Sequence, residues 1–361
     1  MNILHVVDMI SQYRAGGSAK VPYQLGQAQA RLGHNVSIYS SDYQAEDQSP
    51  PHGVSLDKFH CVINFMGVRV TPGMLLADFK QFDIVHLHNY RTLVNVIAAN
   101  KGLPSVLQAH GSCLPLRTLA NPLHNFVWRN YILKQASAYI ADAEMEIDHY
   151  VAEGADHQKV RVIPVGIDIK EFAKLPTRKK GEKKRVLFLG RLHPLKGADL
   201  LAKAMQLLVT WGNDVTLAFA GIDYGYEAEL HKLVADLGVE SNVEFLGACY
   251  GDAKIREYTN ADVYVMPSRY EMFGLTFLEA LACGTPVIIT DKCGAAPLLP
   301  EKCGMVVPVD CIAMAEAISK TLNEHKADID RQYRIGWARQ YDWTNIAPRV
   351  IKVYERVLNR G

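Results

Sequence analysis

Two glutamates eight positions apart, Glu271 and Glu279, have the type and spacing to hold a polar ligand. They lie in the stretch 268-SRYEMFGLTFLEALACGTPVIITDKCG-294. An ionised carboxylate accepts two hydrogen bonds, so each glutamate can bind a pair of hydroxyl groups. The pattern predicts a helix from about 274 to 283 that Gly284 ends, with Glu271 just before it and Glu279 just over one turn inside it. We therefore expect the two carboxylates to have different roles.

A second loop, 190-GRLHPLKG-197, places two cations ahead of another predicted helix. Arg191 offers a planar, bidentate group and Lys196 a compact point charge, and together they can neutralise phosphate oxygens. The free amides at a helix N-terminus add about half a positive charge. The two loops together suit a diphosphate whose substituents carry hydroxyls at both ends, as in a nucleotide diphosphate-sugar.

Both loops follow short apolar runs of the kind that form buried strands. Runs such as 2-NILHVV-7 alternate with helical segments through the first half of the chain, and the pattern restarts at 185-RVLFLG-190. This alternation predicts an α/β fold with two Rossmann-like domains, each with a parallel sheet. The polar, basic stretch 171–185 favours a boundary there, so the domains are expected at 1–170 and 171–340. Ligands of such sheets bind beyond the carboxyl ends of the strands.

In the first domain the residues after the strands give weaker signals. Gly16 and Gly17 precede a predicted helix and would let backbone amides approach an anion or a sugar. No G-x-G-x-x-G follows the first strand, although Asp42 imitates the acid that binds a ribose in that motif. An ordinary loop is the alternative for this segment.

Three histidines stand at strand ends of the first domain. His86 and His88 alternate on one strand and His110 closes another, so a zinc site is one interpretation, although the sequence shows no clear carboxylate partner nearby to support it. For His110, followed by Gly111, the favoured role is a neutral imidazole that hydrogen-bonds a polar ligand. A purely structural histidine is the alternative. The prediction is that the protein holds no metal.

Length and composition narrow the class of protein. The chain has 361 residues and a formal net charge of +1, so no global field selects nucleic acid as a partner. Its seven cysteines are scattered and never spaced C-x-x-C, which predicts reduced thiols. No basic leader and no apolar window of about 18 residues occur, which predicts a cytoplasmic enzyme, either soluble or peripheral at the inner face of a membrane.

The segment E-x7-E with its trailing ALACGTPVI resembles that of retaining GT-B glycosyltransferases of the family-four type, the glycosyl transferases group 1. The chain also resembles that family at GGS (16–18), HG (110–111), PVGID (164–168) and GRLHPLKG (190–197). The resemblance covers nearly the whole chain and implies two domains facing across a cleft. The ending 341–361 resembles the family's last helices, which return to complete the first domain.

Roles for individual residues follow from the resemblance. It implies that Arg191 and Lys196 hold the donor diphosphate, Glu279 the ribose and Glu271 the hydroxyls of the transferred sugar, while His110 contacts the sugar at the reaction centre. The remaining donor-binding residues would be Gly16, Gly17, Phe273, Gly274 and Leu275. Neither a metal ion nor any other cofactor is implied. In ADAEME (141–146) alanine stands where many relatives have serine, so Glu144 is left without a role.

The expected function is transfer of a sugar from a nucleotide diphosphate-sugar to a hydroxyl acceptor, in the synthesis of a glycan, glycolipid or cell-surface polysaccharide. A nucleotide-sugar epimerase and a non-catalytic nucleotide-sugar-binding subunit are the alternatives. The acceptor is expected at segment 113–134, where Phe126 and Trp128 stand among Arg129 and Lys134. Such a mixture suits a lipid-linked acceptor at an anionic membrane surface, or simply a helix buried against the sheet.

Overall fold

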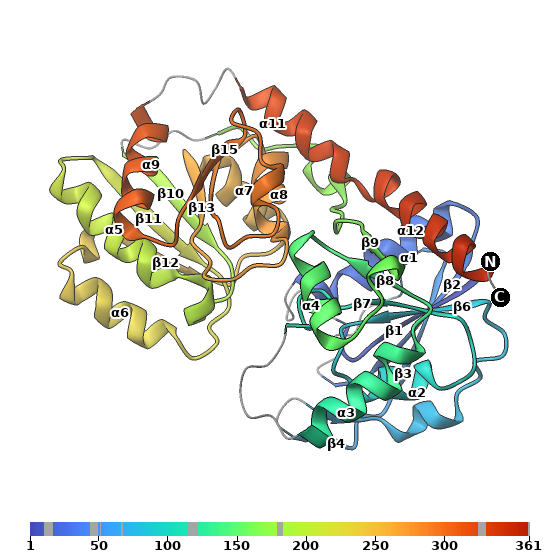
Figure 1. The fold of residues 1–361 in the computed structure, drawn as a ribbon. Coiled ribbons are helices and arrows are strands. Elements are labelled where there is room, and N and C mark those ends of the chain that lie inside the picture. The colour runs from blue at the N-terminus through green and yellow to red at the C-terminus, as the bar shows by residue number, and fades with distance from the viewer. Residues whose placement is uncertain are drawn as a thin grey trace. The chain divides into compact units, whose positions relative to one another are not determined.

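The chain forms two compact units in a computed structural model, which describes residues 1–10, 17–43, 50, 52–65, 68–114, 122–178, 183–323 and 330–359 (Figure 1). Unit 1 comprises Met1–Gly166 together with Trp343–Gly361, and unit 2 comprises Ile167–Asp342. The boundary lies close to the expected residue 170, and the C-terminal segment returns to unit 1.

Unit 1 is built on a parallel sheet of seven strands in the order β3-β2-β1-β6-β7-β8-β9. The strands are β1 Asn2–Val7, β2 Asn35–Ser41, β3 Val54–Phe59, β6 Ile84–His88, β7 Ser105–Gln108, β8 Ala138–Ala141 and β9 Val160–Val162. A separate antiparallel hairpin pairs β4 Ile63–Phe65 with β5 Val68–Val70. The α-helices are α1 Val21–Arg31, α2 Leu93–Ala99, α3 Pro122–Tyr131, α4 Met145–Glu153 and α12 Trp343–Leu358. The 3-10 turns are η1 Gly17–Ala19, η2 Pro72–Leu76, η3 Leu133–Gln135 and η4 His157–Lys159.

The two faces of this sheet differ in polarity. On one face Leu4, Val85 and Leu107 pack with Val94 of α2 and Trp128 of α3 in a continuous apolar core. The other face carries α1 and α12, which contact each other. It buries the histidines of β1 and β6 because alternate residues of a strand point to opposite faces. The buried histidines of these two strands thus lie beneath α1 and α12.

Unit 2 repeats the plan with six parallel strands in the order β12-β11-β10-β13-β14-β15. The strands are β10 Lys184–Leu189, β11 Val215–Ala220, β12 Val243–Gly247, β13 Val263–Met266, β14 Val287–Thr290 and β15 Gly304–Val307. The α-helices are α5 Ala198–Thr210, α6 Glu227–Asp236, α7 Gly251–Asn260, α8 Leu275–Ala282, α9 Cys311–Asn323 and α11 Arg331–Ala338. The 3-10 turns are η5 Ile169–Phe172, η6 Pro194–Lys196, η7 Glu240–Asn242, η8 Ala296–Leu298 and η9 Arg339–Tyr341.

Both faces of the unit 2 sheet are covered. Val186 and Phe188 of β10 pack with α5, α6 and α9 in one core cluster. On the other face Tyr264 of β13 meets Tyr258 of α7, and α8 packs beside α7 and α11. Burial on both faces explains why these strands read as unbroken apolar runs. Two parallel-sheet units of alternating strands and helices confirm the predicted fold class.

Candidate functional site

The strand order of unit 2 reverses between β10 and β13, and the predicted donor loops follow these two strands. At such a switch point the connections leave in opposite directions and open a crevice at the carboxyl ends of the strands. There the Lys196 ammonium forms an ion pair with the Glu271 carboxylate. Their side chains are 19% and 18% exposed, so both can still meet a ligand. The structure therefore brings together two residues that the sequence assigned to neighbouring parts of one donor.

Arg269 ties the two loops together. Its guanidinium donates to both carboxylate oxygens of Asp199, at 2.7 and 2.6 Å, and its backbone amide donates to the carbonyl of Leu195 at 2.8 Å. A bidentate pair of this kind fixes geometry as well as charge. Arg269 was given no role from the sequence, although an arginine just after a strand and, in the other donor loop, an aspartate in the first turn of the following helix α5 were visible signals.

Gly197 allows the closest approach between these loops. Its φ is 71°, and a Cβ at this position would lie 2.0 Å from the carbonyl oxygen of Pro267. No side chain fits in that space without moving the backbone. The loop after β10 is thus held directly against the loop after β13.

The start of α8 is shaped by Gly274, whose φ is 85°. A Cβ there would lie 2.8 Å from the Met266 sulfur and 3.1 Å from the Glu271 side chain. Phe273 is buried, whereas Leu275 begins the helix and is only partly buried. The first amides of α8 consequently begin next to the Lys196–Glu271 pair, as the anion-binding prediction requires.

Glu279 faces α7. Lys254 donates to one of its carboxylate oxygens at 2.6 Å, and the Tyr258 hydroxyl donates to the other at 3.0 Å. Burial alone would lower the pKa of Lys254, but the attraction and hydrogen bond of Glu279 outweigh it, so the pKa is raised. The Glu279 side chain remains 13% exposed. Its predicted ribose contact would use the exposed part of the carboxylate.

Arg191 is exposed at the rim of the same edge. Its guanidinium lies over the ring of Tyr224, 5.2 Å from the centroid, which is a cation–π contact. Hydrogen bonds from the Leu192 amide to Ile222 and from the Tyr224 amide back to Leu192, at 2.9 and 3.1 Å, anchor this part of the loop. The backbone beside Arg191 is therefore held in place, and the guanidinium remains accessible to a ligand.

In unit 1, His110 follows β7 with a φ of 52°, an uncommon conformation for a residue with a side chain. Its Nδ1 lies 2.8 Å from Asp142 Oδ2 and its Nε2 lies 3.1 Å from His88 Nδ1. The ring is only 3% exposed. Both ring nitrogens are engaged inside unit 1, so a contact between the ring and a sugar would have to replace or share one of these bonds.

Two buried carboxyl groups lie behind His110. Asp142 also accepts from Gln108 at 2.7 Å, and Glu146 accepts from the backbone amides of Gly111, at 2.6 Å, and Asp142, at 2.8 Å. Burial, and then the charge of Asp142, raise the pKa of Glu146 well above the usual range. Glu144, for which the sequence indicates no role, is exposed. Glu146 was missed because helical phase, not sequence order, decides which acid of α4 points inward, and Asp142 was missed although it directly follows the strand β8.

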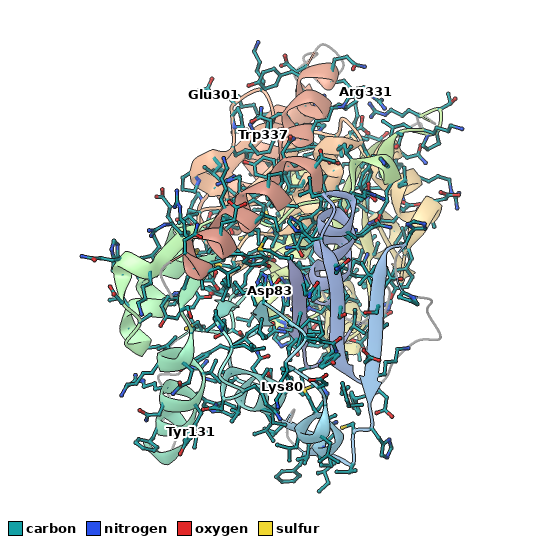
Figure 2. The ribbon with its side chains drawn as sticks, turned by 90° about the vertical axis from the view of Figure 1, so that its right-hand side faces the viewer. Lys80, Asp83, Tyr131, Glu301, Arg331 and Trp337 are labelled. Carbon is teal, nitrogen blue, oxygen red and sulfur yellow. The ribbon has the colours of Figure 1, made fainter. Side chains whose placement is uncertain are left out.

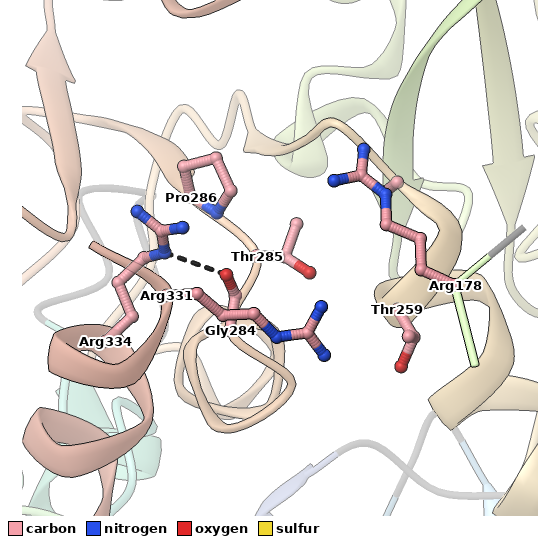
Figure 3. Close-up of a pocket in the computed structure, with 8 residues that line it drawn as sticks. Arg178, Thr259, Gly284, Thr285, Pro286, Arg331 and Arg334 are labelled. Carbon is pink, nitrogen blue, oxygen red and sulfur yellow. Dashed lines mark hydrogen bonds between the residues drawn. The ribbon is translucent and has the colours of Figure 1, made fainter. Parts of the chain in front are cut away.

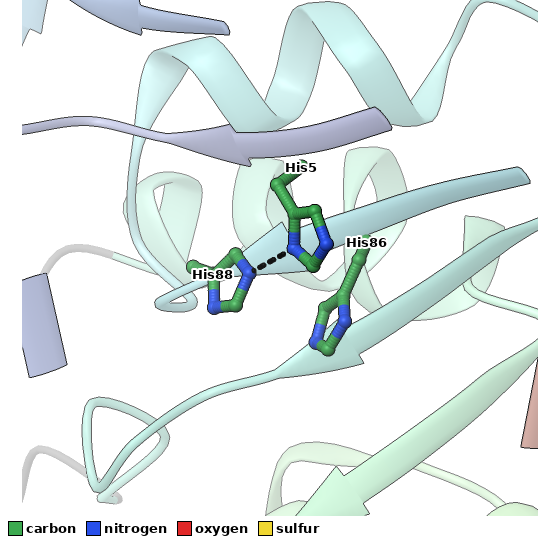
Figure 4. A group of neighbouring side chains, drawn as sticks. All are labelled: His5, His86 and His88. Atoms are coloured by element: carbon green, nitrogen blue, oxygen red, sulfur yellow. Dashed lines mark hydrogen bonds between the residues drawn. The ribbon is translucent and has the colours of Figure 1, made fainter. Parts of the chain in front are cut away.

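The histidine group differs from the one that the sequence suggested. The ring nitrogens within 4.8 Å of one another belong to His5, His86 and His88, so His5 takes the place of His110 (Figure 4). The rings of His86 and His88 are stacked 4.2 Å apart, and His5 Nδ1 lies 2.8 Å from His88 Nε2. Both nitrogens of His5 and of His88 take part in hydrogen bonds, which leaves few free lone pairs for a metal. A hydrogen-bonded cluster describes this group better than a zinc site.

The remaining predicted positions are placed as follows. Gly17 is exposed and opens η1 after β1, whereas Gly16 lies outside the described residues. Asp42 accepts from the Cys61 amide at 2.7 Å and pairs with His60 at 2.8 Å, so it closes a turn beside β3. The role of Gly17 in donor binding therefore stays a prediction, whereas the Asp42 carboxylate is used by its own turn.

A small pocket in unit 2 lies at the opposite edge of the sheet, where α8 ends (Figure 3). Arg334 donates to the carbonyl of Gly284 at 2.8 Å, and the Arg331 side chain lies over the same glycine. Cations at this position complement the partial negative charge of a helix C-terminus. The arginines that line the pocket therefore stabilise the end of α8, and the pocket lies away from the carboxyl ends of the strands.

Family models match both halves of the chain. Residues 169–335 match glycosyl transferases group 1, and residues 15–171 match Glycosyltransferase Family 4. This chain belongs to the family-four type of GT-B glycosyltransferases. The glycosyltransferase fold is also that of a crystallised Anabaena protein, HepE, which is 19% identical, has a TM-score of 0.81, and matches over 99% of this chain and 100% of its own.

Curated relatives of this glycosyltransferase span nearly its full length. An uncharacterised glycosyltransferase of Methanocaldococcus jannaschii is 27% identical over 94% of this chain and 94% of its own. The GDP-mannose:cellobiosyl-diphosphopolyprenol alpha-mannosyltransferase of Xanthomonas campestris is 26% identical over 99% of this chain and 97% of its own. The expected family and the GT-B fold of this glycosyltransferase are therefore confirmed.

Proposed function

We propose that this glycosyltransferase moves a sugar from a nucleotide diphosphate-sugar to a hydroxyl acceptor with retention of configuration. The observation that carries the proposal is the pairing of Lys196 with Glu271 beside the first turn of α8. An anion and its hydroxyl-bearing substituent would find a cation, helix amides and a carboxylate within one small region. The solved structure of HepE contains UDP and glucose, and the Xanthomonas relative is named for GDP-mannose, which supports a nucleotide-sugar donor.

Binding of the donor would rearrange the ion pair. The diphosphate competes for Lys196, and Arg191 joins it from the rim. Glu271 then loses its partner and accepts the hydroxyls of the transferred sugar, while Glu279 accepts from the ribose. Phe273, Gly274 and Leu275 present the helix amides, and Gly16 and Gly17 are kept in the proposal as further donor-binding residues.

The chemical step we propose is a displacement on one face of the sugar. The acceptor oxygen bonds to the anomeric carbon as the bond from that carbon to the phosphate oxygen breaks, and the acceptor proton passes to the departing phosphate. Asp142 and Glu146 are buried and already hydrogen-bonded, which disfavours either as a covalent nucleophile. Lys196, Arg191 and the helix end stabilise the charge on the leaving group. We propose that no metal ion or other cofactor takes part.

The test begins with a thermal-shift screen of UDP- and GDP-sugars, because a ligand at ~100 times its dissociation constant adds roughly 2.7 kcal/mol of stability. The anomeric configuration of the product, followed by NMR, then tests retention. A changed sugar formed without any acceptor would favour the epimerase, and donor binding without turnover on any acceptor would favour a binding subunit. An inverted product would overturn the mechanism.

We further propose that the acceptor is a glycan or a lipid-linked sugar, and that unit 1 contacts a membrane from its inner face. Among the residues described, no helix is long and apolar enough to span a bilayer. Part of segment 113–134, residues 115–121, lies outside the described residues. In the rest of that segment Trp128 is buried, as the structural alternative expects, but Phe126 and Tyr131 are 55% and 46% exposed. Figure 2 labels Tyr131 at the end of α3.

Exposed apolar side chains continue from α3 onto nearby segments, which supports a membrane contact. Leu75 and Leu76 of η2 are 56% and 91% exposed. The loop after α2 joins the two regions, because Asn100 donates to the carbonyl of Tyr131 at 2.8 Å and Lys101 to that of Leu75 at 2.7 Å. Apolar groups beside a lysine suit the interface of an anionic bilayer.

Flotation with vesicles that contain anionic lipid tests this contact. Leu76→Ser should reduce the bound fraction, whereas Trp211→Ser, which changes an exposed apolar residue of unit 2, should leave it unchanged. Equal binding by both variants and the wild type would contradict the proposed surface.

A further inference from the structure

A continuous row of hydrogen-bonded side chains runs through unit 1, and we call it the histidine row. It joins Asp142, His110, His88, His5 and Gln29 by distances of 2.8, 3.1, 2.8 and 2.7 Å. Its members come from the ends of β8 and β7, from β6 and β1, and from α1. All five side chains are buried. The row therefore links the carboxyl edge of the sheet to the helix that covers it.

The histidine row has two possible arrangements, which differ in the direction of its hydrogen bonds and in its number of protons. Each of its four hydrogen bonds needs one proton, and a neutral imidazole has one N–H and one lone pair. Three neutral rings supply three protons, an ionised Asp142 supplies none, and Gln29 faces His5 with its amide oxygen. One proton is missing, so either the row carries an added proton or the Gln29 amide is reversed. The nitrogen and oxygen of an amide are assigned from their partners, so both orientations are consistent with the atom positions.

The reversed amide satisfies every bond without an added proton. Gln29 then donates to His5, each ring donates to the next from its Nδ1, and His110 donates to Asp142. The amide oxygen of Gln29 accepts from the Tyr354 hydroxyl, which lies 3.2 Å from the amide and also contacts His86 Nδ1. In the other arrangement His110 donates to His88, His88 donates to His5, and His5 donates to the Gln29 oxygen. One ring is then an imidazolium.

The added proton belongs on His110. Burial lowers the pKa of His5 to about 4, and burial together with neighbouring rings lowers the pKa of His88. His110 lies against the Asp142 carboxylate, which stabilises an imidazolium. In both arrangements His110 keeps a proton on Nδ1, so its ring orientation and its donor to Asp142 do not change.

We propose that His88, His5 and Gln29 are positioning residues that fix the ring and tautomer of His110, and that the row takes up one proton as a single unit. The role in catalysis rests on the proposed function, in which His110 acts at the reaction centre. Other titratable groups that face the row are His86 of β6, Tyr354 of α12, and Glu146 and Tyr150 of α4. None of them supplies a hydrogen bond within the row itself.

Two substitutions at Gln29 give opposite predictions. Gln29→Glu keeps the shape but leaves only acceptors at that end, so His5 must donate to it and the protonated arrangement is favoured. The row should then take up its added proton at higher pH. Gln29→Leu removes the acceptor that the protonated arrangement needs, so protonation should move to lower pH. His157→Gln changes an exposed histidine outside the row and is the control.

The measurement is NMR of the whole chain labelled with ¹⁵N-histidine, in which His110→Gln identifies the His110 signals. The shifts of the ring nitrogens report the tautomer, and their change with pH reports protonation. This readout needs no substrate, so it stands even if the proposed transfer reaction fails. Shifts of the same sign in both Gln29 variants, or none in either, would overturn the proposal, as would binding of Zn²⁺ that breaks the row. A donor-saturated assay should show a lower kcat for Gln29→Leu at an unchanged KM.

Discussion

Acid should destabilise unit 1 steeply because three of its histidines are buried as neutral rings. Burial lowers the pKa of His5 from 6.5 to about 4. Burial, followed by the charges of neighbouring rings, lowers the pKa values of His86 and His88 well below 6.5. When the chain unfolds, all three rings enter water and can bind protons that the folded state excludes.

The sign and size of the effect follow from this difference in bound protons. Below pH 6.5 the unfolded state binds more protons than the folded state, so the free energy of unfolding increases with pH. The stabilisation is complete above pH 6.5 and is lost as the pH falls toward the folded pKa values. For His5, a fall from 6.5 to about 4, at about 1.4 kcal/mol for each pKa unit, amounts to about 3 kcal/mol. Near pH 5.5 the three rings together contribute a slope of about 4 kcal/mol per pH unit.

Urea unfolding between pH 5 and pH 8 measures this slope in the wild type and in His86→Phe. Among the described residues His86 Nε2 has no partner, and the Tyr354 hydroxyl keeps its bond to Gln29 when the ring is replaced. The variant should lose about 1.4 kcal/mol per pH unit of slope, whereas His157→Phe, on an exposed turn, should lose none. An unchanged slope in His86→Phe would mean that this ring is not held neutral, and the reasoning about the buried cluster would be wrong.

Three further predictions concern the donor site. Arg191→Ala and Lys196→Ala should each lower kcat by ~100-fold while the melting temperature is kept, because each removes charge stabilisation of the leaving group; near-normal rates would refute the diphosphate assignment. In calorimetry, Glu279→Gln should weaken binding of the nucleotide-sugar and of the nucleoside diphosphate alike, whereas Glu271→Ala should weaken binding of the nucleotide-sugar only. Equal losses of affinity for both ligands in Glu271→Ala would contradict the assignment of Glu271 to the sugar. Turnover should continue in the presence of EDTA. If EDTA abolished turnover and a divalent ion restored it, the metal-independent mechanism would be contradicted.

The parts of the site that the sequence revealed are local ones. The expected helix at 274–283 is α8 at Leu275–Ala282, and the expected cations lie on the loop between β10 and α5. These signals are local because a strand, a glycine and a helix start occupy one short segment. The Lys196–Glu271 contact follows once the strand order places β10 beside β13.

The histidine row could not be predicted in the same way. His5 stands opposite His86 only because β1 pairs with β6 in one particular register, and His110 joins them through β7. A histidine within an apolar strand gives no sequence signal of its neighbours, so the proposed group of His86, His88 and His110 omitted His5. Likewise Glu279 gave no hint of Lys254, because the two helices that carry them meet only in the folded unit.

The return of α12 to unit 1 has a consequence for how the chain folds during its synthesis. Trp343 of α12 donates to Gln24 of α1 at 2.9 Å, and Tyr354 meets Gln29 and His86 on the histidine face of the sheet. All of unit 2 is translated before Trp343 and Tyr354 are made. Domains generally fold as units while they emerge from the ribosome. Unit 2 can therefore mature first, while the β1 and β6 face of unit 1 stays uncovered until the final helix arrives, and a chain stalled before Trp343 would expose that face to chaperones and proteases.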